Sequence, residues 1–76
     1  MKLTYDPEVD AAYLYLVPSI GRGEVVRTIS SMLEMDRSFV AFDVDSEGKI
    51  LGIEILGASR VLPGVTLEEA ARPDLS

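Results

Sequence analysis

Residues 39–57 read FVAFDVDSEGKILGIEILG, and this stretch decides the fold class of the chain. Apolar residues alternate with other residues from Phe39 to Asp45 and again from Lys49 to Gly57. An alternation with a period of two is typical of β-strands. Between the two runs, Ser46-Glu47-Gly48 supplies a glycine for the positive φ that a short hairpin loop requires. The stretch therefore predicts an antiparallel hairpin.

Three more strands are expected on the N-terminal side of this hairpin. β-branched and aromatic residues favour strands from Lys2 to Tyr5, from Ala11 to Val17 and from Glu24 to Met35. The first two are separated by Asp6-Pro7-Glu8, which is typical of a turn because proline presets φ at the second position. Asp36-Arg37-Ser38 predicts a second turn, just before the hairpin.

The C-terminal residues predict a helix. Thr66 is followed three residues later by Glu69, which is the pattern of a capping box. The helix is expected to begin at Thr66 and to end near Arg72, because Pro73 disfavours a helical residue before it. The predicted fold class is therefore mainly β (α+β), an antiparallel sheet of about five strands with a short C-terminal helix. The length of 76 residues allows one domain, 1–76.

Two of the expected strands are apolar on both faces. Within Ala11–Val17, Tyr13 and Tyr15 share one face, while Leu14 and Leu16 share the other. Hydrophobic residues make up 47% of a chain that can bury only about 60% of its unfolded surface, so association is expected, most simply as a homodimer. The residues expected at an interface are Tyr13, Tyr15, Leu14, Leu16, Ile50, Glu54 and Leu56.

The composition argues against several classes of function. The chain has no Cys and no His, so it lacks the usual zinc ligands and the Ser–His and Cys–His pairs of nucleophilic catalysis. Its 13 acidic and 7 basic residues give a net charge of -6, which disfavours nucleic acid because phosphates attract basic surfaces. We therefore expect no enzyme activity, no cofactor, no metal site and no nucleic-acid partner.

The expected location is the cytoplasm. The longest apolar run, Ala11 to Val17, is far shorter than the roughly 20 residues of a membrane span, so no membrane partner is expected. The first residues carry no apolar segment of the kind found in targeting signals. The absence of Cys also fits a reducing compartment.

Acidic residues at the hairpin come close to a calcium-binding motif. The EF-hand spacing is matched by Asp43, Asp45, Gly48 and Glu54, with Glu47 as the departure. An EF-hand loop lies between two helices, whereas both flanks here predict strands. In an extended chain of about 3.3 Å per residue, Glu54 would lie roughly 20 Å from the turn, too far to share an ion with Asp43 and Asp45. The acids are therefore expected to serve a solvated hairpin, with acid–base catalysis as the alternative.

Glu54 is a single charge inside the apolar run of the last expected strand. If it were buried, it would need a cationic partner such as Arg27 or Arg60, or a raised pKa. On an exposed face of the sheet it needs neither, so its burial decides how it is interpreted.

Three motifs resemble a family of short bacterial and archaeal proteins, domain of unknown function 2283. They are Tyr5-Asp6-Pro7-Glu8 followed by Asp10-Ala11-Ala12-Tyr13, Phe42-Asp43-Val44-Asp45 followed by Gly48, and Gly52-Ile53-Glu54-Ile55-Leu56-Gly57-Ala58-Ser59. The resemblance covers roughly residues 1 to 62. It departs at Gly57, where the family leads us to expect Asp or a similar polar residue.

The family that the chain resembles has no established activity or catalytic residues, so the resemblance transfers none to this sequence. Some members look like partners of small toxin-like proteins encoded beside them, which implies an antitoxin-like role. The expected function is thus a non-enzymatic protein-binding module that binds a small basic protein. Two alternatives stay open: a small metal-dependent or carboxylate-based hydrolase subunit that uses Asp43, Asp45 or Glu54, and a purely structural homo-oligomer.

Overall fold

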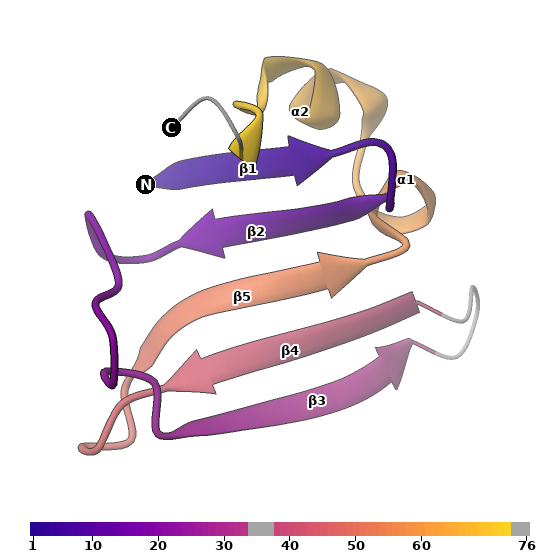
Figure 1. Cartoon of the computed structure of the whole chain (residues 1–76). Coiled ribbons are helices and arrows are strands. Elements are labelled where there is room, and N and C mark those ends of the chain that lie inside the picture. Colours follow the sequence, from indigo (N-terminus) through magenta and orange to yellow (C-terminus); the bar gives the residue numbers. More distant parts are fainter. Residues whose placement is uncertain (34–37, 74–76) are drawn as a thin grey trace.

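The chain folds into one five-stranded antiparallel sheet with two short helices after it, as the computed structural model shows (Figure 1). The structure describes residues 1–33 and 38–73. The strand order is β1-β2-β5-β4-β3, so the last strand of the sequence lies in the middle of the sheet. The strands are β1 Lys2–Asp6, β2 Ala11–Tyr15, β3 Arg27–Leu33, β4 Ser38–Val44 and β5 Ile50–Leu56. The predicted antiparallel sheet of five strands is confirmed.

The hairpin of β4 and β5 forms where the sequence predicted it. Its ladder pairs Asp43 with Gly52 and then Val44 with Ile50, so Leu51 is an extra residue that forms a β-bulge. Gly48 has a φ of 83°, the left-handed conformation that the loop requires of its glycine. The Asp45 carboxylate accepts hydrogen bonds from two backbone amides of the loop, both at 2.9 Å. Asp45 therefore serves the turn itself.

The register assigns each strand residue to one of two faces, because directly paired residues of an antiparallel ladder lie on the same side. We define the tyrosine face by Lys2, Tyr13, Tyr15, Thr28, Phe39, Asp43, Glu54 and Leu56. We define the aliphatic face by Leu3, Ala12, Leu14, Ile29, Val40, Phe42, Ile53 and Ile55. The two faces thus differ sharply in chemistry, although both contain apolar residues.

β2 and β3 each depart from the prediction at one end, and β5 is one residue shorter than predicted at both ends. β2 ends at Tyr15, and Leu16 adds one further backbone bond, to Leu51, before Pro18 removes a donor. β3 begins at Arg27, because Gly23 has a φ of 83° in a turn that also bonds Glu24 to Gly21. The predicted end of that strand at Met35, and the turn at Asp36-Arg37-Ser38, lie outside the described residues except for Ser38, which belongs to β4.

The C-terminal region holds two helices rather than the single one that was predicted, and the predicted capping box is wrong. They are α1 Ala58–Val61 and α2 Gly64–Glu69. Pro63 is the N-cap of α2 and no side chain caps the helix, so Thr66 lies inside it. The helix ends at Glu69 instead of near Arg72, because Ala71 exchanges two backbone bonds with the outer edge of β1. In the described residues no helix is long and apolar enough to cross a membrane.

The molecule is a flat slab whose interior is thin. Its principal extents are 33 × 31 × 18 Å, with α2 beside β1 and α1 near the end of β5 (Figure 1). The buried apolar residues are mostly small: Ala12, Ala41, Val44, Leu51 and Ala58. The larger side chains of both faces stay half-buried or exposed. A fold of this shape keeps its two sheet faces close to the solvent.

Candidate functional site

A chain of side-chain contacts crosses the tyrosine face from one edge of the sheet to the other. Tyr13 donates a hydrogen bond from its hydroxyl to Oδ2 of Asp43 at 2.6 Å, from β2 to β4. Thr28 donates one to Oδ1 of the same carboxylate at 2.7 Å, from β3. Both oxygens of Asp43 are therefore engaged, and the carboxylate links three strands.

The Tyr13 side chain reaches Asp43 by lying across β5. Gly52 is the β5 residue beneath it, and a Cβ built there would overlap the Tyr13 hydroxyl and ring. The pKa of Tyr13 is raised, mainly by burial of its hydroxyl and, to a smaller extent, by the hydrogen bond to Asp43. The phenol therefore stays protonated and donates this bond. The absence of a side chain at Gly52 is thus what makes this contact across the sheet possible.

Tyr15 extends the same row toward β1. The rings of Tyr13 and Tyr15 pack edge to face, with centroids 4.8 Å apart and planes at 67°. The Lys2 ammonium lies 5.4 Å from the centroid of Tyr15, within the range of a cation–π contact. The two tyrosine rings therefore pack against each other, and both stay half-buried on an open face.

The structure divides the predicted interface residues between the two faces. Tyr13, Tyr15, Glu54 and Leu56 lie together on the tyrosine face. Leu14 is on the aliphatic face, and Leu16 follows β2 with the same alternation. Ile50 lies at the β-bulge and is 44% exposed. Sequence alternation separated the two sides of each strand, but only the register shows which strands contribute to each face.

Glu54 is exposed, with Tyr13 and Ala41 as its cross-strand neighbours. It therefore needs no buried cationic partner. Arg27 is paired with Val44 and so belongs to the other face of the sheet. The open position of Glu54 gives the tyrosine face a solvated negative charge.

The register also corrects the distance argument made for the hairpin acids. Asp43 pairs with Gly52, so Glu54 is its diagonal neighbour on the same face, on the order of 7 to 8 Å away. Asp45, by contrast, belongs to the turn at the end of the hairpin. Within residues 1–33 and 38–73, no three His, Cys, Asp or Glu side chains gather as metal ligands would. The expectation that these acids do no catalysis stays a prediction.

A second cluster lies around Asp10, where the turn between β1 and β2 contacts the residues that follow β5. Tyr5 donates a hydrogen bond to Oδ1 of Asp10 at 2.7 Å. Ser59 donates from its backbone to Oδ1 at 2.9 Å and from its hydroxyl to Oδ2 at 2.7 Å. The Asp10 carbonyl accepts the amides of Gly57 and Ala58, which begin the first helix. These five residues belong to two of the family-like motifs of the sequence, the one that begins at Tyr5 and the one that ends at Ser59.

The Asp10 cluster has a structural role, because it ties the β1–β2 turn to the start of α1; we call this set of contacts, from Tyr5, Asp10, Gly57, Ala58 and Ser59, the clasp. The hydrogen bonds of Ser59 and then of Tyr5 lower the pKa of Asp10, which makes its carboxylate a weaker base. Asp10 itself has a φ of 55°, a left-handed conformation that Asp tolerates better than most residues. Gly57 has a φ of 75°, and a Cβ built there would lie 2.6 Å from Ser38 Oγ, so the close approach of Ser38 as well as the backbone favours glycine where a polar residue was expected. The sequence shows the motif of Asp10 and the motif of Ser59, but it does not show that the two are in contact in the fold.

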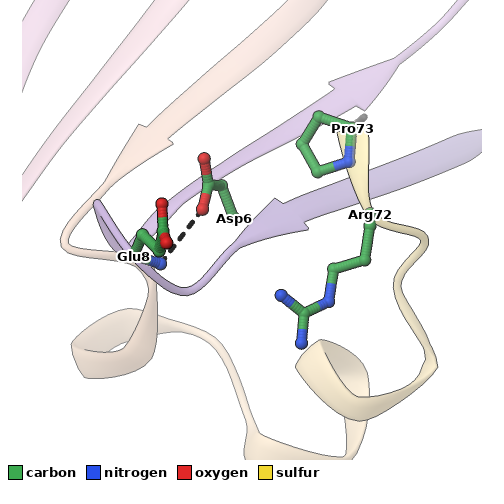
Figure 2. Close-up of a pocket in the computed structure, with 4 residues that line it drawn as sticks. All are labelled: Asp6, Glu8, Arg72 and Pro73. Carbon is green, nitrogen blue, oxygen red and sulfur yellow. Dashed lines mark hydrogen bonds between the residues drawn. The ribbon is translucent and has the colours of Figure 1, made fainter. Parts of the chain in front are cut away.

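A small hollow beside the β1–β2 turn is a third candidate. It has a volume of about 230 Å³ and is lined by Asp6, Glu8, Arg72 and Pro73 (Figure 2). The dashed line in Figure 2 is the bond from the Glu8 amide to Asp6 Oδ1, 3.0 Å long, which closes the turn. Ligand pockets usually measure about 300 to 1,000 Å³ and are mainly apolar, so this hollow does not fit a typical small-molecule site.

The protein is thus a small antiparallel-sheet domain in which the Asp10 cluster links the β1–β2 turn to α1, and in which one sheet face, the tyrosine face, carries aromatic and acidic side chains. A family model described as Protein of unknown function (DUF2283) matches residues 2–59. The chain belongs to this family, and the match ends at Ser59, the residue that closes the clasp. No curated protein and no solved structure matches the chain.

Proposed function

We propose that the chain is a non-enzymatic protein-binding module of the cytoplasm, and that its tyrosine face binds a small basic protein. The observation that carries the proposal is the grouping, on one flat and accessible face, of two packed tyrosines with an exposed carboxylate. Tyrosine is enriched at protein interfaces because its ring is apolar while its hydroxyl bonds with water or a partner. Near the tyrosines, Leu56 and Phe39 are 40% and 39% exposed and would add apolar contact.

The contacts within the tyrosine face favour binding because they fix its side chains in advance. Tyr13 is held by Asp43 and packs against Tyr15, so little rotamer entropy remains to be lost on association. Glu54 is solvated and supplies a charge that a basic surface would complement. The net charge of -6 would also accelerate the approach of a cationic partner.

Affinity capture from a native lysate would test this function. The bait is the unchanged chain, and Glu54→Lys reverses the charge that the proposal needs. Val65→Ser is the matched control, because Val65 lies in α2, away from the strands that form this face, and is 63% exposed. The expected result is one small basic protein, recovered in a fixed ratio by the chain and by Val65→Ser, with at least tenfold less recovered by Glu54→Lys.

The same capture experiment, repeated at increasing salt concentration, tests whether the binding is electrostatic. Recovery is expected to fall as salt is raised, because solvent-exposed charge pairs are screened beyond a Debye length of about 8 Å at 0.15 M. Recovery of no basic protein in fixed ratio contradicts the proposed function. Equal recovery by Glu54→Lys contradicts the assignment to the tyrosine face.

A further inference from the structure

A row of large apolar side chains crosses the aliphatic face on all five strands. The row consists of Leu3, Leu14, Ile53, Phe42 and Ile29, in the order of the strands from β1 to β3. The first four are only half-buried, and Ile29 is 48% exposed. Side chains of this kind are normally among the most fully buried in a protein, so the row lacks a complete cover.

The exposed area of the whole chain is larger than that of a compact monomer of the same mass. The chain exposes 5409 Å², whereas a compact monomer of 8.3 kDa is expected to expose roughly 4,600 Å². Its radius of gyration of 12.4 Å likewise exceeds the roughly 11.4 Å expected for a compact domain of this length. The surplus of roughly 800 Å² equals what one partner contributes to an interface of standard size.

Charge decides which face can meet a second copy. Two chains of net charge -6 repel each other, and a two-fold interface places each patch against its own copy. On the tyrosine face, pairing would bring Asp43 and Glu54 toward the same carboxylates of the other chain. The eight residues that define the aliphatic face are uncharged, whereas Arg27 of β3 lies on the same side of the sheet and Glu69 of α2 lines a hollow with Leu3 at the β1 edge.

We propose that a second copy of this chain docks on the aliphatic face, sheet against sheet, to form a two-fold dimer. Packed sheets lie about 10 Å apart with their side chains interleaved, a distance that would cover the row completely. The two tyrosine faces then point outward on opposite sides of the dimer. The dimer does not depend on the binding of any basic protein.

Sedimentation equilibrium across a dilution series tests the dimer. Ile29→Lys places a charge inside the proposed interface, at the β3 end of the apolar row, and the lysine stays accessible on this edge strand in the free chain. Ser30→Lys is the matched control, because Ser30 is the next residue of β3, is exposed and lies on the opposite face. Leu56→Lys is a second control, since Leu56 is an apolar residue of the tyrosine face with a similar exposure of 40%.

At micromolar concentration the unchanged chain and both controls are expected to have twice the chain mass of 8.3 kDa. Ile29→Lys is expected to be a folded monomer, with a dimer dissociation constant raised at least about a hundredfold because the change enters the interface twice. Thermal melting of each variant shows whether it folds.

Three results would overturn the proposal: a monomeric unchanged chain, a dimer that survives Ile29→Lys, or a dimer that Leu56→Lys or Ser30→Lys disrupts as strongly. The last would indicate pairing through the tyrosine face or through the edge of β3. If Ile29→Lys does not fold, methyl NMR of the unchanged chain on dilution decides instead. Shifts at Leu14 and Ile53 support the dimer, while shifts confined to residues of the tyrosine face, or none at all, refute it.

Discussion

Replacing Gly52 with alanine should destabilise the protein, although alanine is ordinarily the better residue in a strand. A Cβ at this position would overlap the Tyr13 hydroxyl and ring, so Tyr13 must move away from Asp43. A hydrogen bond to a charged group contributes about 1.5 to 3 kcal/mol, and alanine in place of glycine returns about 0.5 to 1 kcal/mol. The expected net loss is about 1.5 kcal/mol, or roughly 6 to 12 °C in melting temperature for a domain of this size.

A double-mutant cycle isolates the cause. In a Tyr13→Ala background the space above β5 is open, so Gly52→Ala is expected to be neutral or to stabilise by up to about 1 kcal/mol. Gly64→Ala is the control, because Gly64 has no heavy atom within 4 Å of a built Cβ. Urea unfolding at one fixed protein concentration measures all the variants, since any dimer makes stability depend on concentration. Equal losses from Gly52→Ala in both backgrounds would refute the reasoning.

Two further changes test the clasp and the open charge. Asp10→Asn keeps a residue that tolerates a positive φ but removes the carboxylate bonded by Ser59 and Tyr5, so a loss of about 2 kcal/mol is expected at neutral pH. Because the folded-state pKa of Asp10 is lowered from 3.8, this stabilisation is complete above that value and disappears as the pH falls through the folded-state pKa. Acid unfolding curves of the two chains should therefore begin to converge only below pH 3.8 and meet once the pH has fallen through the folded-state pKa, and a constant difference would contradict the charge argument. Glu54→Leu should change the free energy of unfolding by less than about 0.5 kcal/mol or raise it, because Glu54 is exposed; a loss above about 1 kcal/mol in urea unfolding would show that Glu54 has a structural partner.

The sheet could be predicted from the sequence because its signals are local and repeated. The alternation in β4 and β5 fixed two strands and both of their faces, and Gly48 fixed the loop between them. The contact of Tyr13 with Asp43 could not be predicted in the same way. It joins residues 30 positions apart, and it depends on the register and on a glycine in the strand between them.

The helices show the opposite case, in which contacts distant in sequence overrule a local pattern. Ala71 pairs with β1, and this pairing takes the chain out of the helix before Arg72. Asp10 accepts the amides of Gly57 and Ala58, which helps to start α1 at a place where no capping pattern stands in the sequence. The end of α2 is set by β1, which precedes it by almost the whole length of the chain, and the start of α1 by the β1–β2 turn, which precedes it by more than half of that length.

The position of β5 in the sheet has a consequence for how the protein is synthesised. This strand lies between β2 and β4, yet it is the last of the five to leave the ribosome. A nascent chain that ends before Ile50 can form at most two separate hairpins, and an isolated hairpin is marginal in water. The corner closed by Asp10 and Ser59 also becomes available only a few residues later. The domain is therefore expected to fold in one late step, after most of the chain has been translated, rather than strand by strand.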